Sequence, residues 1–225
     1  MATCGSRLAV RTKGELACFT RPELKVERFS YPIITPSAAR GLLESILWKP
    51  AIKWVIERVK VLSPIKFTSI RRNELNSKAP APKSGLILEG GEYACCHIED
   101  CRIQRNTVAL RDVDYIIEAH FEMTGKAGEQ DNVVKFEEMF RRRVANGQYY
   151  YVPCFGCREF TADISEVTGG EHPVGESRDF GLMLWDILYG EENRAIFFDA
   201  RMVGGVMEVP GSWELAMGTI MGGGR

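Results

Sequence analysis

The alternation of apolar and polar side chains in residues 114–123 is the feature that most constrains the fold. Successive side chains of an extended chain point to opposite faces. In this stretch, DYIIEAHFEM, one face would carry Tyr115, Ile117, Ala119, Phe121 and Met123, and the other Glu118, His120 and Glu122. Such a pattern predicts a strand in a sheet with one packed face and one solvated face. We therefore expect His120 on the polar face of a sheet.

Two amphipathic helices are predicted, one before and one after this strand. Residues 35–48, TPSAARGLLESILW, begin with Thr35 as the N-cap, followed by a proline suited to the first helical position. The second helix begins after Asp131 or Asn132 and ends at Gly147. Each helix has a stripe of apolar residues at helical spacing, so we expect each to pack on a sheet.

Three further strands complete the pattern: RLAVRTKG at 7–14, IKWVIERVKVL at 52–62 and REFTADI at 158–164. The stretch from about 73 to 106 is polar and rich in proline and glycine, and we interpret it as an insertion. This order predicts an α+β fold in which residues 1–164 form a ferredoxin-like (RRM-like) βαββαβ domain. Residues 165–225 would add a smaller C-terminal β-sheet.

The composition is typical of a folded protein, with 45% hydrophobic and 26% charged residues. A chain of 225 residues is long enough for one domain with a small appendage. Nowhere is there a run of about 18 apolar residues that would indicate a membrane span. Residues 1–14 also lack the apolar core of a signal peptide. We therefore expect a cytoplasmic protein with no membrane partner.

Seven cysteines, an odd number, favour reduced thiols over a secreted disulfide framework. A structural zinc site is the alternative, because Cys154-x-x-Cys157 has the spacing of a zinc ribbon. Further ligands would have to come from the cluster Cys95, Cys96, His97 and Cys101. No second C-x-x-C pair exists, however, and PCFGCREF is typical of an apolar turn that enters a strand. We expect no metal and no cofactor.

The whole-chain charge of −1 conceals a strong asymmetry. Residues 1–72 contain 14 lysines and arginines against 5 acidic residues, whereas residues 73–225 contain 15 against 25. Clustered cations bind polyanions because binding releases counterions condensed on the phosphates. The basic third therefore predicts a polyanion partner, with Arg21, Lys25, Arg28, Arg40, Lys49, Arg71 and Arg72 as candidate phosphate ligands.

Three consecutive arginines near the end of the second helix are further candidates. Successive helical residues turn by about 100°, so residues 141–143 cannot all share one face. One or two of them, Arg141 and Arg142, would reach phosphate. Alternatively, these arginines pair with Glu137 or Glu138 on the same helix.

Aromatic residues beside the two helices are candidates for base stacking. Trp48 follows the first helix, and residues 149–151 are three tyrosines that follow the second. For Trp48, which lies just before a proline, packing in the core is the favoured interpretation.

Four long runs carry a resemblance to a known family: ACFTRPELKVERFSYPIITPSAARGLLESILWKPAIKW, VKVLSPIKFTSIRRNELNSK, LRDVDYIIEAHFEM and FRRRVANGQYYYVPCFGCREF. They lie between about residues 16 and 164, without gaps and in one order. With these runs the chain resembles the CRISPR-associated Cas five family of subtype I-C.

The resemblance implies a ferredoxin-like N-terminal domain and a small C-terminal β-sheet domain. Members of the family recognise the repeat hairpin of precursor CRISPR RNA, cut at its 3′ base without a metal ion, and keep the 5′ handle. A positioned base activates the ribose 2′-hydroxyl, which attacks the adjacent phosphate and leaves a cyclic phosphate. The implied partners are this RNA and the backbone and large subunits of a type I-C Cascade complex, with duplex DNA as a further candidate.

The catalytic residues of the family do not carry over unchanged. The family has a Tyr or His before the Trp-Lys-Pro of the first helix, where this chain has Leu47, and a Lys-His pair that falls on Val134 and Lys135. Lys135 is still a candidate for stabilising charge at the phosphate, with a solvated helix lysine as the alternative. His120 is the candidate proton acceptor, with a structural or partner-contacting histidine as the alternative.

We therefore predict a metal-independent endoribonuclease that matures precursor CRISPR RNA and then serves as the handle-binding subunit of the complex. The alternative is a non-cleaving structural subunit that binds the handle and nucleates the complex. Generic nucleic-acid binding by a basic domain is the third hypothesis.

Overall fold

The structure is a computed structural model that describes residues 4–24, 26–76, 97–190 and 193–222. It has an α+β fold built on a sheet of nine strands. The strands are β1 (Leu8–Ala17), β2 (Arg28–Phe29), β3 (Ile52–Val61), β4 (Phe67–Leu75), β5 (Arg102–Met123), β6 (Asp163–Ser165), β7 (Arg178–Leu188), β8 (Arg194–Val203) and β9 (Val206–Glu208). The helices are α1 (Pro36–Ile46), α3 (Ile98–Cys101), α4 (Val133–Ala145) and α5 (Trp213–Gly222).

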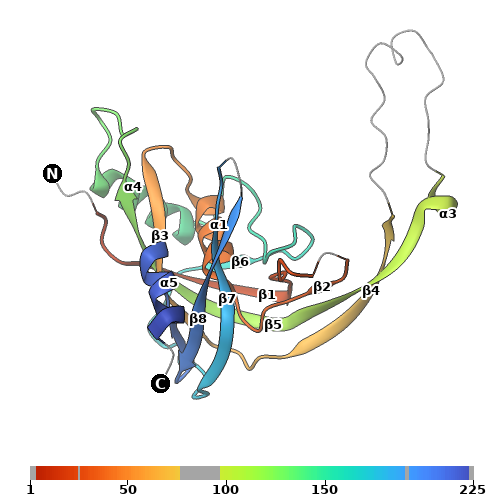
Figure 1. Ribbon diagram of the computed structural model, residues 1–225. Coiled ribbons are helices and arrows are strands. Elements are labelled where there is room, and N and C mark those ends of the chain that lie inside the picture. The colour runs from red at the N-terminus through yellow and green to blue at the C-terminus, as the bar shows by residue number, and fades with distance from the viewer. Residues whose placement is uncertain (1–3, 25, 77–96, 191–192, 223–225) are drawn as a thin grey trace, which may run out of the picture.

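The 22-residue strand β5 organises the sheet. Its second half lies between β1 and β3, both antiparallel to it, and the strand order is β6-β1-β5-β3-β9-β8-β7. Its first half pairs with β4 and, over two residues, with β2. Figure 1 shows a curled sheet from which β4 and the first half of β5 project as a two-stranded ribbon. The strand predicted at 114–123 is therefore confirmed as the end of a longer strand.

Helices α1 and α4 pack on one face of the sheet, where their apolar stripes meet inward-pointing aromatic residues. The ring of Phe136 on α4 lies 6.3 Å from that of Phe121 on β5, centroid to centroid. Phe140, one turn further along α4, lies 4.9 Å from Trp54 on β3. Burial of several large rings at one helix–sheet contact is a major source of stability, because apolar burial contributes about 25 cal/mol per Å².

Both helices begin at the predicted caps. The Thr35 hydroxyl accepts a hydrogen bond from the Ala38 N–H, and the Asn132 side chain accepts one from the Lys135 N–H. Asn132, not the adjacent aspartate, is thus the N-cap of α4. Gly147 has φ +60°, a left-handed conformation that glycine adopts at no steric cost, and it directly follows the C-cap of α4.

The two ends of the segment predicted as an insertion are strand residues of the ribbon. Residues 73–75 belong to β4 and residues 102–106 to β5, and they pair in an unbroken antiparallel register. Both faces of the ribbon are solvated here, so the sequence has no apolar alternation to reveal a strand. Residues 77–96 lie outside the described residues.

The last three strands continue the same sheet, because β9 pairs with β3 on one side and with β8 on the other. The strand predicted at 158–164 is shorter and later than expected. Its first residues form a turn, in which the Phe155 N–H donates to the Phe160 carbonyl, and β6 begins only at Asp163. Among the described helices, none is long and apolar enough to cross a membrane.

Candidate functional site

An ion pair between Lys135 and Asp131 lies at the start of α4, and Lys49, which follows α1, is near it. Lys135 Nζ lies 2.9 Å from Asp131 Oδ1, and the ammonium group of Lys49 is near enough to act on the same carboxylate. Hydrogen bonds from Lys135 and from the Gly128 N–H, together with attraction to both lysines, lower the pKa of Asp131. This lysine cluster (Lys49, Asp131 and Lys135) presents two cations and an ionised carboxylate at the protein surface.

The lysine cluster occupies the position where the resemblance places a catalytic centre, but the other two expected side chains are apolar. Leu47 is fully buried, and its carbonyl accepts a hydrogen bond from Trp54 Nε1 at 2.9 Å. Val134 is 62% exposed. Neither side chain can transfer a proton. Asp131, considered in the sequence only as a helix cap, was missed, although its spacing of four residues from Lys135 is a signal of an ion pair on one helix face.

His120 lies on the opposite face of the sheet from the lysine cluster. The adjacent Phe121 packs on α4, so the alternation of the strand directs His120 to the other side. There its Nδ1 lies 2.6 Å from Glu57 Oε1, and Arg7 donates to the same carboxylate. Burial alone would raise the pKa of Glu57, but the two hydrogen bonds lower it. The polar-face prediction is confirmed, whereas His120 and Lys135 are not brought into one site.

Three predicted phosphate ligands line one cavity of about 580 Å³ beside the start of α1. Arg21 follows β1, Arg28 begins β2 and Arg40 belongs to α1. Among the described residues of the lining, Asp186 of β7 is the one carboxylate. The Nε atoms of Arg21 and Arg40 are buried and find no hydrogen-bond partner among the described residues. All three arginines also make ion pairs, Arg21 with Glu23, Arg28 with Glu74 and Glu159, and Arg40 with Glu44 and Asp186. An anion in this arginine cavity would therefore compete with carboxylates for these guanidinium groups.

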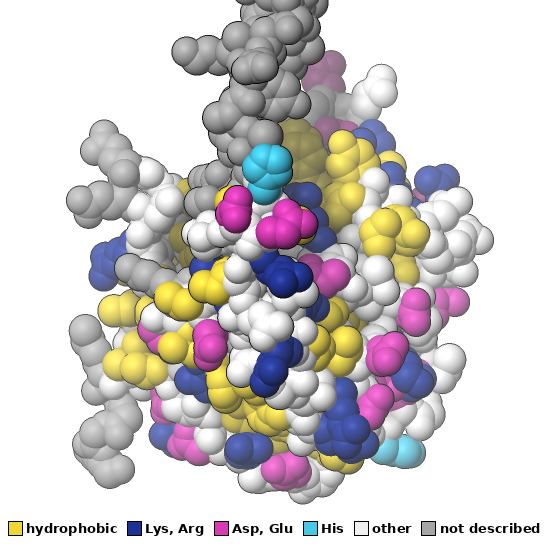
Figure 2. All heavy atoms as spheres, turned by 90° about the vertical axis from the view of Figure 1, so that its right-hand side faces the viewer, with side chains coloured by type: hydrophobic (Ala, Val, Ile, Leu, Met, Phe, Trp, Pro, Cys, Tyr) yellow, Lys and Arg dark blue, Asp and Glu magenta, His cyan; other side chains and the backbone are white. Residues whose placement is uncertain are grey.

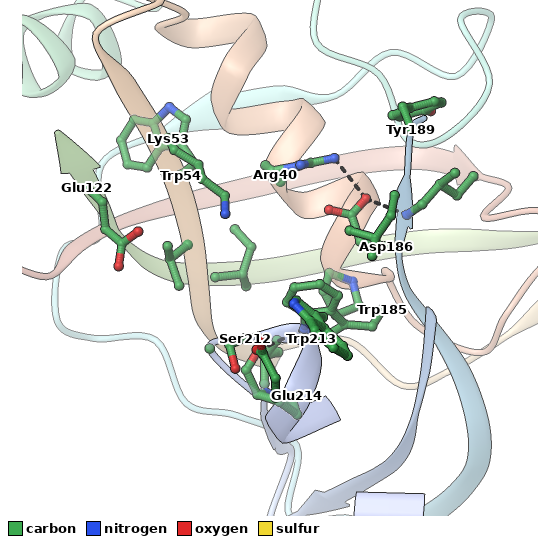
Figure 3. Close-up of a pocket in the computed structure, with 18 residues that line it drawn as sticks. Arg40, Lys53, Trp54, Glu122, Trp185, Asp186, Tyr189, Ser212, Trp213 and Glu214 are labelled. Atoms are coloured by element: carbon green, nitrogen blue, oxygen red, sulfur yellow. Dashed lines mark hydrogen bonds and ion pairs between the residues drawn. The ribbon is translucent and has the colours of Figure 1, made fainter. Parts of the chain in front are cut away.

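A second cavity, of about 550 Å³, adjoins the arginine cavity between β3 and β7. Figure 3 shows the Arg40 guanidinium directed at Asp186, whose Oδ1 it contacts at 2.9 Å, on the wall that the two cavities share. The second cavity also holds Lys53, Glu122 and Glu214, so its charges are mixed. Of these two cavities, the arginine cavity is the one whose described lining combines three cations with one carboxylate.

Ion pairs occupy several of the predicted ligands, Arg28 of the arginine cavity among them. Arg28 and Arg72 both bind Glu159, and Arg141 binds Glu137 at 3.1 Å. These carboxylates lie beyond residue 72, so folding offsets much of the charge asymmetry of the sequence. Figure 2 shows basic and acidic side chains interspersed on the side that bears the ribbon, not one continuous basic surface.

The remaining predicted ligands are Arg71, Arg142 and Lys49. All three are exposed, and none makes an ion pair with another residue of the described chain. Lys25 lies outside the described residues. Arg143, the third arginine of the run, donates instead to the Ile46 carbonyl and joins α4 to α1.

Exposed aromatic side chains lie beside α1 and just after it. Trp48 is 54% exposed, so the favoured interpretation of core packing is wrong. The three tyrosines at 149–151 are also exposed, at 48%, 73% and 47%. They are attached to α1, because the Tyr150 N–H donates to the Ser45 carbonyl at 2.7 Å and the Tyr151 hydroxyl to the Gly41 carbonyl at 3.2 Å.

The cysteines do not form a recognisable metal centre in the described part of the chain, where no group of three or more His, Cys, Asp or Glu side chains is arranged to hold an ion. Cys154 and Cys157 are free thiols. Cys101 is disulfide-bonded, contrary to the expectation that all thiols are reduced. Cys95 and Cys96 lie outside the described residues.

Comparison with known proteins identifies close relatives. Residues 7–210 match a family model described as CRISPR-associated protein (Cas_Cas5). The chain is 46% identical over 214 residues to a protein of Mannheimia succiniciproducens, covering 91% of this chain and 95% of that protein. It is 37% identical over 224 residues to a protein of Thermus thermophilus, covering 91% and 92%. Both relatives are named CRISPR pre-crRNA endoribonuclease Cas5d.

Solved structures share the fold. A CRISPR-associated protein superposes with a TM-score of 0.67 at 21% identity, over 92% of this chain and 93% of the other. A chain of a CRISPR RNA-guided surveillance complex superposes with a TM-score of 0.52 at 14% identity, over 91% of each. The family match over most of the sequence and the identity to both relatives show that the chain belongs to the Cas5 family of CRISPR-associated proteins, subtype I-C.

Proposed function

We propose that this protein is an endoribonuclease that cuts precursor CRISPR RNA and remains bound to the product as a subunit of a Cascade complex. The observation that carries the proposal is 46% identity, over 91% of the chain, to a protein named as a pre-crRNA endoribonuclease. The match to the family model, residues 7–210, spans the lysine cluster, the arginine cavity and the strands around them.

We further propose that residues 1–164 form a ferredoxin-like domain and that residues 165–225 are a smaller β-rich domain. The sheet order β6-β1-β5-β3, with α1 after β1 and α4 after β5, supports a βαββαβ unit in which the ribbon is an extension. The second domain would comprise β7, β8, β9 and α5.

The RNA strand is proposed to run along α1 from the arginine cavity to the lysine cluster. An 11-residue helix spans about 16 Å, so the two sites are separated by a short length of nucleic acid. The arginine cavity offers three guanidinium groups for a phosphate, and the tyrosines at 149–151 offer exposed rings for bases beside α1. Arg142 on α4 adds an exposed cation that makes no ion pair among the described residues.

In the proposed reaction, a ribose 2′-hydroxyl loses its proton to water and attacks the adjacent phosphate at the lysine cluster, with no metal required. The bond from phosphorus to the 5′-oxygen breaks, and that oxygen leaves with a proton from water. Lys135 stabilises the negative charge that develops on the phosphate, and Asp131 holds the Lys135 ammonium group in place. Leu47 and Val134 supply no proton acceptor, so the cut is expected to be slower than with an ideal base. His120 would accept a proton only from RNA that reaches the opposite face of the sheet.

A non-cleaving handle-binding subunit is the second candidate function. The apolar side chains of Leu47 and Val134 at two of the three family positions favour it. Its partners would be the 5′ handle and the backbone and large subunits of the complex, with duplex DNA as a further candidate.

One assay distinguishes the two functions. The pure protein is incubated with its cognate repeat RNA in EDTA, and the product ends are analysed. The enzyme hypothesis predicts a single cut whose upstream fragment ends in a 2′,3′-cyclic phosphate. Tight binding without a product over hours, together with activity gained when Lys and His are placed at positions 134 and 135, would establish the non-cleaving function instead.

A further inference from the structure

Two cysteines far apart in the sequence meet beside the arginine cavity. Cys18 directly follows β1, and Cys157 lies in the turn before β6. The Cys157 thiol donates to the Cys18 carbonyl oxygen at 3.9 Å, and the two thiols are near enough to shift each other's pKa. The backbone N–H groups of both residues donate to the same acceptor, the Phe155 carbonyl, each at 3.0 Å. A shared acceptor and the contact of Cys157 Sγ with the Cys18 carbonyl bring the two residues side by side, as a disulfide requires.

Gly156 permits this close approach. It has φ +81°, and a Cβ atom at this position would lie 2.0 Å from the Cys18 carbonyl oxygen. Any other residue would therefore push the turn away from Cys18. The glycine places the Cys157 thiol against Cys18 and also forms part of the wall of the arginine cavity.

The surroundings of Cys157 favour its thiolate. A hydrogen bond from the Cys18 thiol, supported by attraction to Arg28 and Arg72, lowers the pKa of Cys157 to about 7. Arg28 Nη1 lies 3.8 Å from Cys157 Sγ. The same thiol–thiol hydrogen bond and burial raise the pKa of Cys18. The half-buried Cys157 is thus the nucleophile of the pair, and the fully buried Cys18 is positioned to react second.

We propose that Cys157 and Cys18 form an oxidation site for hydroperoxides, which closes to a reversible disulfide. The Cys157 thiolate attacks a peroxide oxygen, the O–O bond breaks, and the released hydroxide or alkoxide takes a proton from water. Cys18 then attacks the sulfur of the Cys157 sulfenic acid; the S–S bond forms, and the hydroxyl leaves as water with the Cys18 proton. For hydrogen peroxide, two thiols and one peroxide give one disulfide and two waters. A dithiol reduces the disulfide and restores both thiols.

The test is peptide mapping after oxidation of the full-length protein. Trypsin releases Cys18 in residues 14–25, since the bond between Arg21 and Pro22 resists cleavage, and it releases Cys154 and Cys157 together in residues 144–158. The reduced protein is treated with one equivalent of hydrogen peroxide, blocked with N-ethylmaleimide and digested. The two peptides should appear as one linked species that dithiothreitol separates.

Matched variants identify the sulfur atoms. The linked species should persist in Cys154→Ser and disappear in Cys157→Ser and in Cys18→Ser. Each variant removes one sulfur without adding bulk, and circular dichroism confirms that the fold is retained. A linked species that persists in Cys157→Ser would overturn the proposal. So would sulfinic acid at Cys157, or a Cys154–Cys157 bond within residues 144–158, without the linked species.

Discussion

Replacing Lys135 by alanine should slow RNA cleavage about 10- to 100-fold while leaving repeat binding within a few-fold. A donor placed at a developing oxyanion is typically worth about 10²- to 10³-fold. The Lys135 side chain is 43% exposed and forms an ion pair with Asp131. Solvent and the carboxylate both weaken its attraction to the phosphate, so the expected loss of rate is smaller. The fold should be unaffected, because an exposed pair four residues apart on a helix contributes only about 0.3–0.5 kcal/mol.

The assay is single-turnover cleavage of radiolabelled repeat RNA, with binding measured separately by filter retention over a range of salt concentrations. Lys126→Ala is the matched control, because Lys126 is an exposed lysine that precedes α4 and makes no ion pair within the described chain. If Lys135→Ala cleaves at the wild-type rate, the assignment is refuted. It is also refuted if binding falls as much as the rate, because Lys135 would then be a simple phosphate contact.

Four further outcomes are expected. His120→Ala should leave cleavage within a few-fold of wild type because His120 faces away from the lysine cluster; a loss as large as that of Lys135→Ala would show that RNA reaches the other face. Replacing Arg21, Arg28 and Arg40 by glutamine should weaken repeat binding and flatten its salt dependence, whereas the same change at Arg178, Arg194 and Arg201 on the C-terminal hairpin should not. Trp54→Phe should lower the free energy of unfolding by about 1–3 kcal/mol in urea titrations, because it leaves the Leu47 carbonyl without its donor; an unchanged midpoint would contradict this. Alkylation of Cys157 by iodoacetamide should rise as pH increases through about 7, because only the thiolate reacts, and a midpoint near 9 would show that Arg28 and Cys18 have no influence.

The sequence was most informative where local chemistry decides the structure. The cap at Thr35, the second cap at either Asp131 or Asn132, and the alternating strand at 114–123 depend on short-range rules, and these predictions are confirmed, with Asn132 as the second cap. The ribbon was not predicted. Both of its faces are in contact with water, so the sequence of β4 has no alternation of apolar and polar residues that would indicate a strand.

The candidate site was harder to predict, because its electrostatics depend on long-range contacts. The excess of basic residues in residues 1–72 suggested arginines without carboxylate partners. In the folded chain, however, Glu74 and Glu159 pair with Arg28, and Asp186 pairs with Arg40. Strand alternation placed His120 on the polar face, but only the packing of Phe121 on α4 shows that this face is opposite the lysine cluster. No pattern in the sequence indicates that Cys18 and Cys157, which are far apart along the chain, lie in contact in the fold.

The most direct test of the central claim is cleavage of a repeat RNA in which the nucleotide before the scissile phosphate lacks its 2′-hydroxyl. The account predicts that the protein binds this RNA as tightly as the unmodified repeat and does not cut it at that site, in EDTA or with Mg²⁺. Cleavage of the 2′-deoxy substrate at the same position would contradict the proposed attack by the ribose hydroxyl.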